Sequence, residues 1–185
     1  MRHRPARVVP EIAYADPDNP FVTLYRDRLE MPDGSVRRYN RIIENAGRAG
    51  VVVLPIRGDA IGLVEQYRYP VGAMCLELPR GFAGDGSALE NAMRELREET
   101  GLAPDAGAFL DLGVLHPDSG LLAGSVQVFA VRIDAHAPAR VEDTDEVARL
   151  HWLARDEFGR RIAGDTIRDA FTLAAVAKAR ARGLW

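Results

Sequence analysis

The sequence predicts a layered α/β domain, of the α+β or α/β/α kind, with a β-hairpin extension at its N-terminal end. Short apolar runs rich in β-branched residues indicate buried strands. Tight-turn signals separate several of these runs, and two segments have the apolar spacing of helices. We place the extension in residues 1–48 and the main domain in residues 49–185.

The N-terminal extension is predicted to be a hairpin. Phe21–Glu30 alternates apolar and polar residues, as a strand with one buried face does. Met31–Gly34 contains Asp-Gly, which supplies the positive φ that a tight turn needs. Ser35–Glu44 is then the returning strand.

The main domain begins with strands that are expected to be buried on both faces. Gly50–Ile56 is a continuous apolar run with three consecutive valines, and a turn at Arg57–Asp59 follows it. The three glycines of Gly81–Gly86 predict a loop. The other predicted strands are Ala60–Tyr67, Met74–Leu78, Phe109–Leu115, Ser125–Ile133 and Ala148–Trp152.

Two helices are predicted. In Ser87–Thr100, Ser87 is a suitable N-cap, and Glu90 three residues later completes a capping box. Gly101 follows as a natural helix terminator. The second helix covers Thr166–Arg182, an alanine-rich segment with apolar periodicity.

Composition narrows the functional classes. The chain has 185 residues and a net charge of −3, whereas nucleic-acid-binding proteins usually carry a basic excess. It has no apolar run near the roughly 20 residues of a spanning helix. Its one cysteine, Cys75, excludes an internal disulfide. We expect a cytoplasmic protein without nucleic-acid or membrane partners.

One predicted helix carries an acidic face. Glu95, Glu98 and Glu99 are spaced i, i+3 and i+4, so their carboxylates share one side of the helix. Like charges at this spacing repel, and Mg²⁺, which prefers oxygen ligands, would neutralise them. The alternative is a solvated acidic face paired with neighbouring arginines. The preceding glycine loop favours the metal site, since backbone N–H groups at a helix N-terminus can meet phosphate.

The segment Gly81–Leu102 resembles the box motif of the Nudix hydrolase superfamily. Its second half, Arg-Glu-Leu-Arg-Glu-Glu-Thr-Gly-Leu, matches the family pattern at every fixed position from Arg94 to Leu102. The first half departs from the pattern, because the loop is one residue short. The family's glutamate slot falls on Ser87 when counted from Gly81 and on Gly86 when counted back from Arg94.

Flanking segments are similar to the ADP-ribose pyrophosphatase branch of that superfamily. They are Ile61–Arg68, Glu77–Gly81 and the hairpin before the main domain. The resemblance implies a Nudix-type α/β/α sandwich around a mixed sheet. It also implies a homodimer that the N-terminal hairpin helps to form.

The resemblance assigns metal ligands and supporting residues. It implies that the helix glutamates, Glu95, Glu98 and Glu99, bind Mg²⁺ or Mn²⁺ and are catalytic. The backbone carbonyl of Arg80 would be a further ligand. Structural roles are expected for Gly81, Arg94 and Gly101, with Arg94 pairing with an acidic residue of the helix.

Further residues are candidates for substrate contact and proton transfer. Arg68 suits a phosphate because its guanidinium donates two parallel hydrogen bonds, although a surface role is an alternative. Glu77 could contact a base or a sugar hydroxyl, or it could pair with Arg68 or Arg80. Arg80 is itself a candidate for substrate binding. Tyr39 could stack on a base or simply pack in its strand. By resemblance, Glu146 is the candidate general base, against a solvated acidic loop.

The resemblance therefore implies metal-dependent hydrolysis of the diphosphate bond in a nucleoside diphosphate sugar. ADP-ribose is the favoured substrate, and the products are a nucleoside monophosphate and a sugar phosphate. GDP-mannose, NADH and dinucleoside polyphosphates are alternative substrates for the same chemistry. A non-catalytic domain that senses nucleotides is the alternative of a different class.

Overall fold

A computed structural model describes residues 4–137 and 147–185. The chain forms two compact units, each held together mainly by contacts within itself. The first consists of Met1–Ala49 together with His116–Ser125, and the second of Gly50–Leu115 and Val126–Trp185. The chain thus leaves the second unit after Leu115 and returns to it at Val126.

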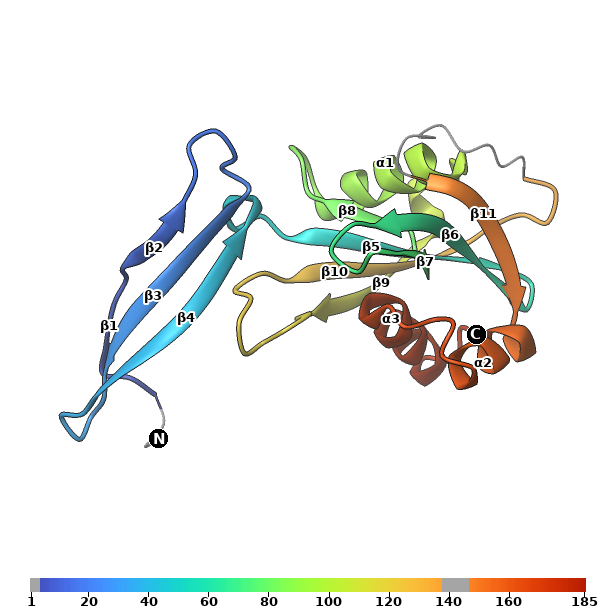
Figure 1. Ribbon diagram of the computed structural model, residues 1–185. Coiled ribbons are helices and arrows are strands. Elements are labelled where there is room, and N and C mark those ends of the chain that lie inside the picture. The colour runs from blue at the N-terminus through green and yellow to red at the C-terminus, as the bar shows by residue number, and fades with distance from the viewer. Residues whose placement is uncertain (1–3, 138–146) are drawn as a thin grey trace. The chain divides into compact units, whose positions relative to one another are not determined.

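The first unit is built around the predicted hairpin. β3 (Val22–Glu30) and β4 (Val36–Glu44) pair antiparallel along their whole length. Met31 donates its N–H to the carbonyl of Ser35 over 2.8 Å, and Gly34 takes the positive φ of 83° that the turn requires. The hairpin prediction is confirmed (Figure 1).

Two short strands that the sequence did not predict extend this sheet. β1 (Arg7–Val9) pairs with the far end of β3, and β2 (Ile12–Ala15) pairs with its beginning. Both occupy the edge of β3 that β4 leaves open. They escaped prediction because they are only three and four residues long, and almost every side chain in them is exposed. A short 3₁₀ turn at Asn45–Gly47 follows β4.

The second unit contains a mixed sheet with the strand order β11-β6-β5-β10-β9. β10 runs parallel to β5, and the other pairings are antiparallel. β7 pairs with β6 and β8 pairs with β5, also antiparallel. The strands are β5 (Gly50–Arg57), β6 (Ala60–Arg68), β7 (Ala73–Glu77), β8 (Arg80–Phe82), β9 (Phe109–Leu115), β10 (Val126–Arg132) and β11 (Val147–Ala154).

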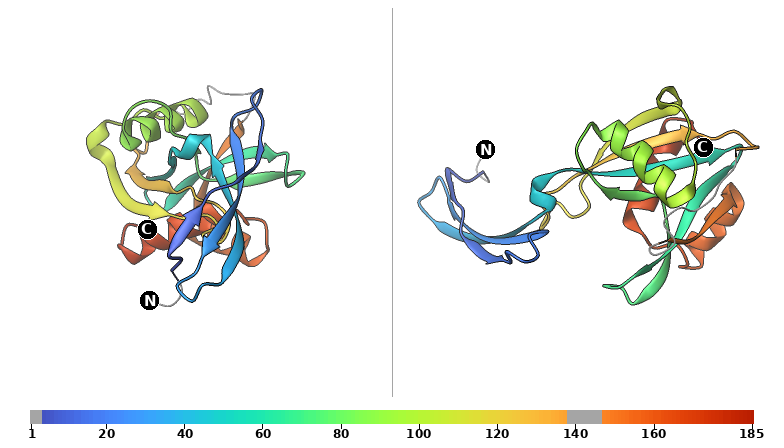
Figure 2. Two further views of the ribbon diagram at one scale, coloured as in Figure 1. Left: turned by 90° about the vertical axis from the view of Figure 1, so that its left-hand side faces the viewer. Right: turned by 90° about the horizontal axis from the view of Figure 1, so that it is seen from above.

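Helices cover both faces of this sheet. α1 (Ala88–Thr100) lies on one face, and α2 (Arg155–Ala163) and α3 (Ala170–Ala181) lie on the other (Figures 1 and 2). A 3₁₀ turn at Ala106–Ala108 leads into β9. The second unit is an α/β/α sandwich around a mixed sheet, and the predicted fold class is confirmed.

β5 divides the core into two clusters. Val51 and Val53 pack beneath α1, whereas Val52 and Leu54 point to the side of α2 and α3. All four side chains are fully buried, as the continuous apolar run predicted. Side chains of β5 therefore pack against α1 and hold the helix on this face of the sheet.

Three local predictions need correction. The segment Gly81–Gly86 is not all loop, because Gly81 and Phe82 belong to β8. α2 was missed because Phe158 is its one buried residue and Gly159 interrupts the helical pattern. α3 begins at Ala170 rather than Thr166, since the Asp169 carboxylate accepts the N–H of Thr172 and caps the helix there. In the described part of the chain, each helix lacks the length or apolar character needed to span a membrane.

Candidate functional site

Both ends of α1 are closed by the residues that predicted it. The hydroxyl of Ser87 accepts the N–H of Glu90 over 3.2 Å, and the Glu90 carboxylate accepts the N–H of Ser87 over 2.7 Å. Gly101 adopts φ 70° and donates its N–H to the carbonyl of Arg97. The predicted capping box is confirmed. It fixes the residue at which α1 begins, and therefore the positions of the glutamates along the helix.

The three glutamates of α1 have different environments. Glu95 and Glu99 are buried between the helix and the sheet, while Glu98 is partly exposed. Arg94 reaches both Glu95, over 2.6 Å, and Glu98, over 2.8 Å. Within residues 4–137 and 147–185, no three acidic, histidine or cysteine side chains already converge as a metal-binding group.

Glu99 is the least compensated of the three carboxylates. Burial, reinforced by the nearby charge of Glu95, raises the pKa of Glu99 to about 8. The hydrogen bond from the N–H of Arg80, 3.2 Å long, opposes this increase only in part. A divalent cation between the two carboxylates would remove the repulsion, and hard cations prefer such oxygen donors. The residues present therefore fit an Mg²⁺ or Mn²⁺ ion.

The glycine segment before α1 contacts side chains of the helix. A Cβ at Gly81 would collide with the carboxylate of Glu95, so a side chain at this position would displace that carboxylate. Farther along, Gly84 donates its N–H to the Asn91 side chain over 2.9 Å. Asn91 in turn donates to the carbonyl of Ser87. The segment is thus tied to the helix at several points.

Sequence reasoning missed Asn91. Its side chain is buried on the same side of α1 as Glu95 and Glu99, which follow it by four and eight residues. This i, i+4 spacing to the glutamates is the signal that could have revealed it. Its amide joins the loop to the first turn of α1.

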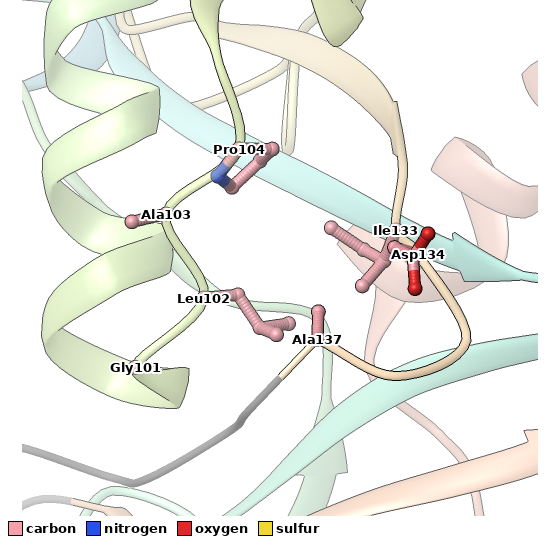
Figure 3. Close-up of a pocket in the computed structure, with 7 residues that line it drawn as sticks. All are labelled: Gly101, Leu102, Ala103, Pro104, Ile133, Asp134 and Ala137. Carbon is pink, nitrogen blue, oxygen red and sulfur yellow. The ribbon is translucent and has the colours of Figure 1, made fainter.

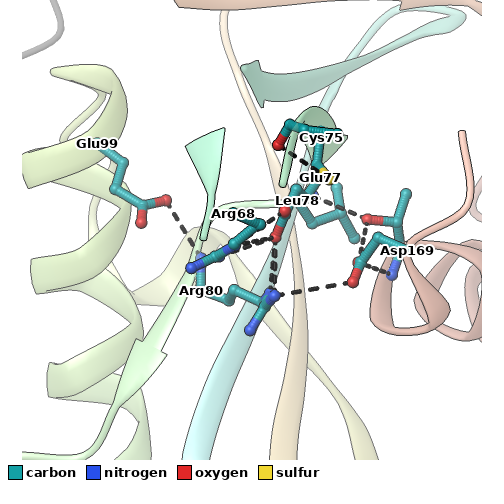
Figure 4. A network of polar contacts seen from close by, with 9 residues as sticks. Arg68, Cys75, Glu77, Leu78, Arg80, Glu99 and Asp169 are labelled. Carbon is teal, nitrogen blue, oxygen red and sulfur yellow. Dashed lines mark hydrogen bonds and ion pairs between the residues drawn. The ribbon is translucent and has the colours of Figure 1, made fainter. Parts of the chain in front are cut away.

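A second polar network lies where β6, β7 and β8 meet. Glu77 is 1% exposed and accepts hydrogen bonds from Arg68 over 2.8 and 2.9 Å and from Arg80 over 3.0 Å (Figure 4). Burial alone would raise the pKa of Glu77, but the two guanidinium groups more than offset it and leave the pKa lowered. The structure thus brings together three of the predicted substrate-binding residues.

Arg80 connects this network to α1. Its main-chain N–H donates to Glu99, while its guanidinium contacts Glu77 and lies 3.8 Å from the carboxylate of Asp169. The same guanidinium stacks over the ring of Phe171, 4.6 Å from the centroid. Asp169 and Phe171 belong to the start of α3 and were not predicted to lie near these residues.

These contacts do not test two of the predicted residues. Tyr39 belongs to the first unit, where its hydroxyl donates to the carbonyl of Gly120 over 2.6 Å. Glu146, the candidate general base, lies outside the described residues. The roles of both residues stay predictions.

A pocket beyond the C-terminal end of α1 is chemically distinct from this site (Figure 3). Its described lining residues are mostly apolar, and the charged one among them, Asp134, accepts the N–H of His136. None of the three helix glutamates lines it. The lining residues are Gly101, Leu102, Ala103, Pro104, Ile133, Asp134 and Ala137.

Sequence comparisons relate this chain to several known proteins. A Nudix hydrolase of Schizosaccharomyces pombe is 30% identical over 131 residues, 65% of this chain and 62% of that protein. The ADP-sugar pyrophosphatase of Mus musculus is 37% identical over 89 residues, 43% of this chain and 39% of that protein. The methanol dehydrogenase activator of Bacillus methanolicus is 29% identical over 157 residues, 84% and 83% of the two chains.

The match to the first two of these relatives covers less than two thirds of their length. Among solved structures, one described as an ADP compounds hydrolase superposes with a TM-score of 0.74 at 18% identity. That superposition covers 100% of this chain and 99% of the other, and it establishes a shared fold. The model of the NUDIX domain matches residues 46–174, more than half of the sequence. The chain belongs to the Nudix family.

Proposed function

We propose that this protein is a metal-dependent pyrophosphohydrolase that cleaves the diphosphate bond of a nucleoside diphosphate sugar, with ADP-ribose as the favoured substrate. Water adds across the P–O–P bridge, and the products are a nucleoside monophosphate and a sugar phosphate. The observation that carries the proposal is the pair of buried carboxylates, Glu95 and Glu99, which repel one another beside the glycine segment.

The site residues divide into those that hold the metal and those that hold the substrate. Glu95, Glu98 and Glu99, with the carbonyl of Arg80, would bind Mg²⁺ or Mn²⁺. Such an ion polarises phosphate oxygens and lowers the pKa of bound water. Because Arg94 now pairs with Glu95 and Glu98, those carboxylates would exchange an arginine partner for the ion.

Substrate binding is proposed for the arginines beside Glu77. Arg68 and Arg80 keep side-chain exposures of 27% and 24% although both contact Glu77. Their remaining N–H groups suit the non-bridging oxygens of a diphosphate. Tyr39 is the candidate for stacking on the base. Glu146, as the family resemblance implies, would accept the proton of the attacking water.

Two relatives support the choice of substrate. Besides the mouse ADP-sugar pyrophosphatase, an ADP-ribose pyrophosphatase of Saccharomyces cerevisiae is 33% identical over 89 residues. These alignments cover 43% and 42% of this chain. A homodimer, as the resemblance implies, is part of the same proposal.

The test is turnover against ADP-ribose, GDP-mannose, NADH and a dinucleoside polyphosphate, with Mg²⁺, with Mn²⁺ and with a chelator. A coupled phosphatase releases phosphate only from monoester products, so the assay reports cleavage of the anhydride. Glu98→Gln should abolish most of the metal-dependent turnover. Glu157→Gln is the matched control, because Glu157 also pairs with arginines but lies on the surface of α2.

Each outcome has a distinct meaning. Metal-dependent cleavage that favours ADP-ribose supports the whole proposal. Preference for another nucleotide keeps the chemistry and rejects the assigned substrate. Nucleotide binding without any turnover would favour a domain that senses nucleotides, and unchanged turnover in Glu98→Gln would refute the metal assignment.

A further inference from the structure

The first turn of α3 holds the segment Leu78–Arg80 from the side opposite α1. The hydroxyl of Thr172, which is fully buried, accepts the N–H of Leu78 over 2.9 Å. The same hydroxyl donates to the carboxylate of Asp169 over 2.7 Å, and that carboxylate faces Arg80 (Figure 4). The Arg80 peptide therefore lies between two helices, with its N–H directed to Glu99 on α1.

The two arginines of this region form their ion pairs with Glu77 and Asp169, and their charges also act on Glu99. Arg68 and Arg80 provide two positive charges, and Glu77 and Asp169 provide two negative charges against them. No ion pair joins Glu99 to an arginine or lysine among the described residues; its contact with Arg80 is through the main chain. Asp169 thus supplies the second anion that these two arginines require.

Removing that anion would change the partner of Arg80. Glu77 alone would face two guanidinium groups, and Glu99 is another carboxylate on which the charge of Arg80 acts. A guanidinium that turned toward Glu99 would compete directly with a cation for the same oxygens. Both the competition and the excess positive charge would weaken cation binding.

We propose that Asp169 is a positioning residue for the metal-binding edge of α1, because it holds the Arg80 guanidinium against Glu77 and Phe171 and leaves Glu99 available to a divalent cation. The proposal rests on the proposed function, since it assigns a role within the same site. Asp169 contacts neither Glu99 nor the other helix glutamates in the described part of the chain, so it acts through Arg80.

Asp169→Asn tests this role with little disturbance of the fold. Asparagine caps a helix about as well as aspartate, so the bonds to Thr172 can persist while the charge is lost. Mn²⁺ binding to the intact chain is measured by the electron paramagnetic resonance signal of free Mn²⁺. We expect Asp169→Asn to weaken Mn²⁺ binding about tenfold, as loss of a residue that orients metal ligands does. Glu157→Gln, which removes one surface carboxylate from its arginine partners, should leave the affinity unchanged.

A double-mutant cycle separates positioning from a general charge effect. Arg80→Met removes the guanidinium but keeps an apolar stem against Phe171. If Asp169 acts by holding that guanidinium, Asp169→Asn should have little further effect in the Arg80→Met background. An equal loss of affinity in both backgrounds would show that the charge acts through space, and it would overturn the proposal.

A kinetic measurement completes the test. In Asp169→Asn, the Mg²⁺ concentration for half-maximal turnover should rise relative to the wild type and to Glu157→Gln. Unchanged Mn²⁺ affinity in Asp169→Asn would overturn the proposal whatever the turnover. If the wild type bound Mn²⁺ but cleaved no nucleotide, the proposed function would fail and the cycle would still decide the role of Asp169. Failure of the wild type to bind Mn²⁺ would overturn both.

Discussion

Glu77 and Glu99 are two buried glutamates of the same unit that contact the same residue, Arg80, yet their electrostatic situations are opposite. Glu77 is 1% exposed and accepts hydrogen bonds from two arginine side chains. Glu99 is 5% exposed and accepts one main-chain N–H, with the carboxylate of Glu95 nearby. The pKa of Glu77 is lowered, and the pKa of Glu99 is raised to about 8.

Burial of a carboxylate therefore has different consequences at these two positions. Cationic partners stabilise the ionised form of a buried carboxylate. The ion pairs also join the strands that carry these residues. A buried carboxylate without such partners destabilises the protein by itself. Its burial becomes favourable when the carboxylate binds a cation. Acids with strongly perturbed pKa values are typical of functional sites.

The largest expected effect on folding is at Glu77. Glu77→Gln leaves Arg68 and Arg80 facing a neutral amide in a buried position. We expect a loss of about 3 kcal/mol in the free energy of unfolding, the lower end for a broken buried pair, because each guanidinium stays about a quarter exposed. Urea denaturation with chelator present measures it. Glu157→Gln is the surface control, and an equally mild effect at both positions would contradict the structural role of Glu77.

Glu99→Gln should have the opposite profile. We expect metal-dependent turnover to fall at least about a hundredfold, or about 2.7 kcal/mol in activation free energy, while the fold persists. Steady-state kinetics at saturating Mg²⁺ measures the first effect. A folded variant that retained most of its turnover would remove Glu99 from the catalytic machinery.

In the absence of metal, the pH dependence of the free energy of unfolding tests the raised pKa of Glu99. Its pKa lies near 4.5 in the unfolded chain and about 8 in the folded chain, so the folded state holds the proton more tightly. The contribution to stability is therefore fully present below the unfolded pKa and is lost as the pH rises toward the folded pKa. With chelator, Glu99→Gln should remove this part of the decline between about pH 5 and about pH 8. Parallel stability curves for variant and wild type would contradict it.

The hydroxyl of Thr172 makes two hydrogen bonds near Arg80. It accepts the N–H of Leu78 and donates to the carboxylate of Asp169. Thr172→Val keeps the shape but leaves the buried Leu78 N–H without its acceptor. We expect a loss of about 2 kcal/mol in the free energy of unfolding. Thr172→Ser keeps the hydroxyl and should cost about 1 kcal/mol, for one buried methyl group. If valine and serine were equally tolerated, the hydrogen bond to Leu78 would not matter for stability.

The elements that the sequence predicted well have local causes. Ser87, Glu90 and Gly101 define α1 through contacts within one or two turns, and Val51–Leu54 indicate a central strand by composition alone. The spacing of the three glutamates predicted that they share one side of the helix. Two of them, Glu95 and Glu99, are buried.

What the sequence did not predict depends on contacts between distant segments. Asp169 lies inside the segment predicted to be helical, Thr166–Arg182, and nothing near it in the sequence indicates that it faces Arg80. The three glycines from Gly81 onward suggested a loop, whereas Gly81 is a strand residue whose missing side chain makes room for Glu95. Tertiary packing decides both cases.

The smallest effect separates the stability of α1 from the chemistry of its glutamates. Ser87→Ala removes the side chain that accepts the N–H of Glu90, and loss of such a cap costs about 1 kcal/mol. Residues Glu95 and Glu99 lie two or three turns farther along, anchored to the sheet, so Mn²⁺ affinity should stay at the wild-type value. Thermal denaturation and Mn²⁺ titration are measured on the same preparation. If the affinity fell together with the stability, the raised pKa of Glu99 would reflect how firmly the helix is held. The contrast with Glu77 would then be one of local rigidity rather than of charge.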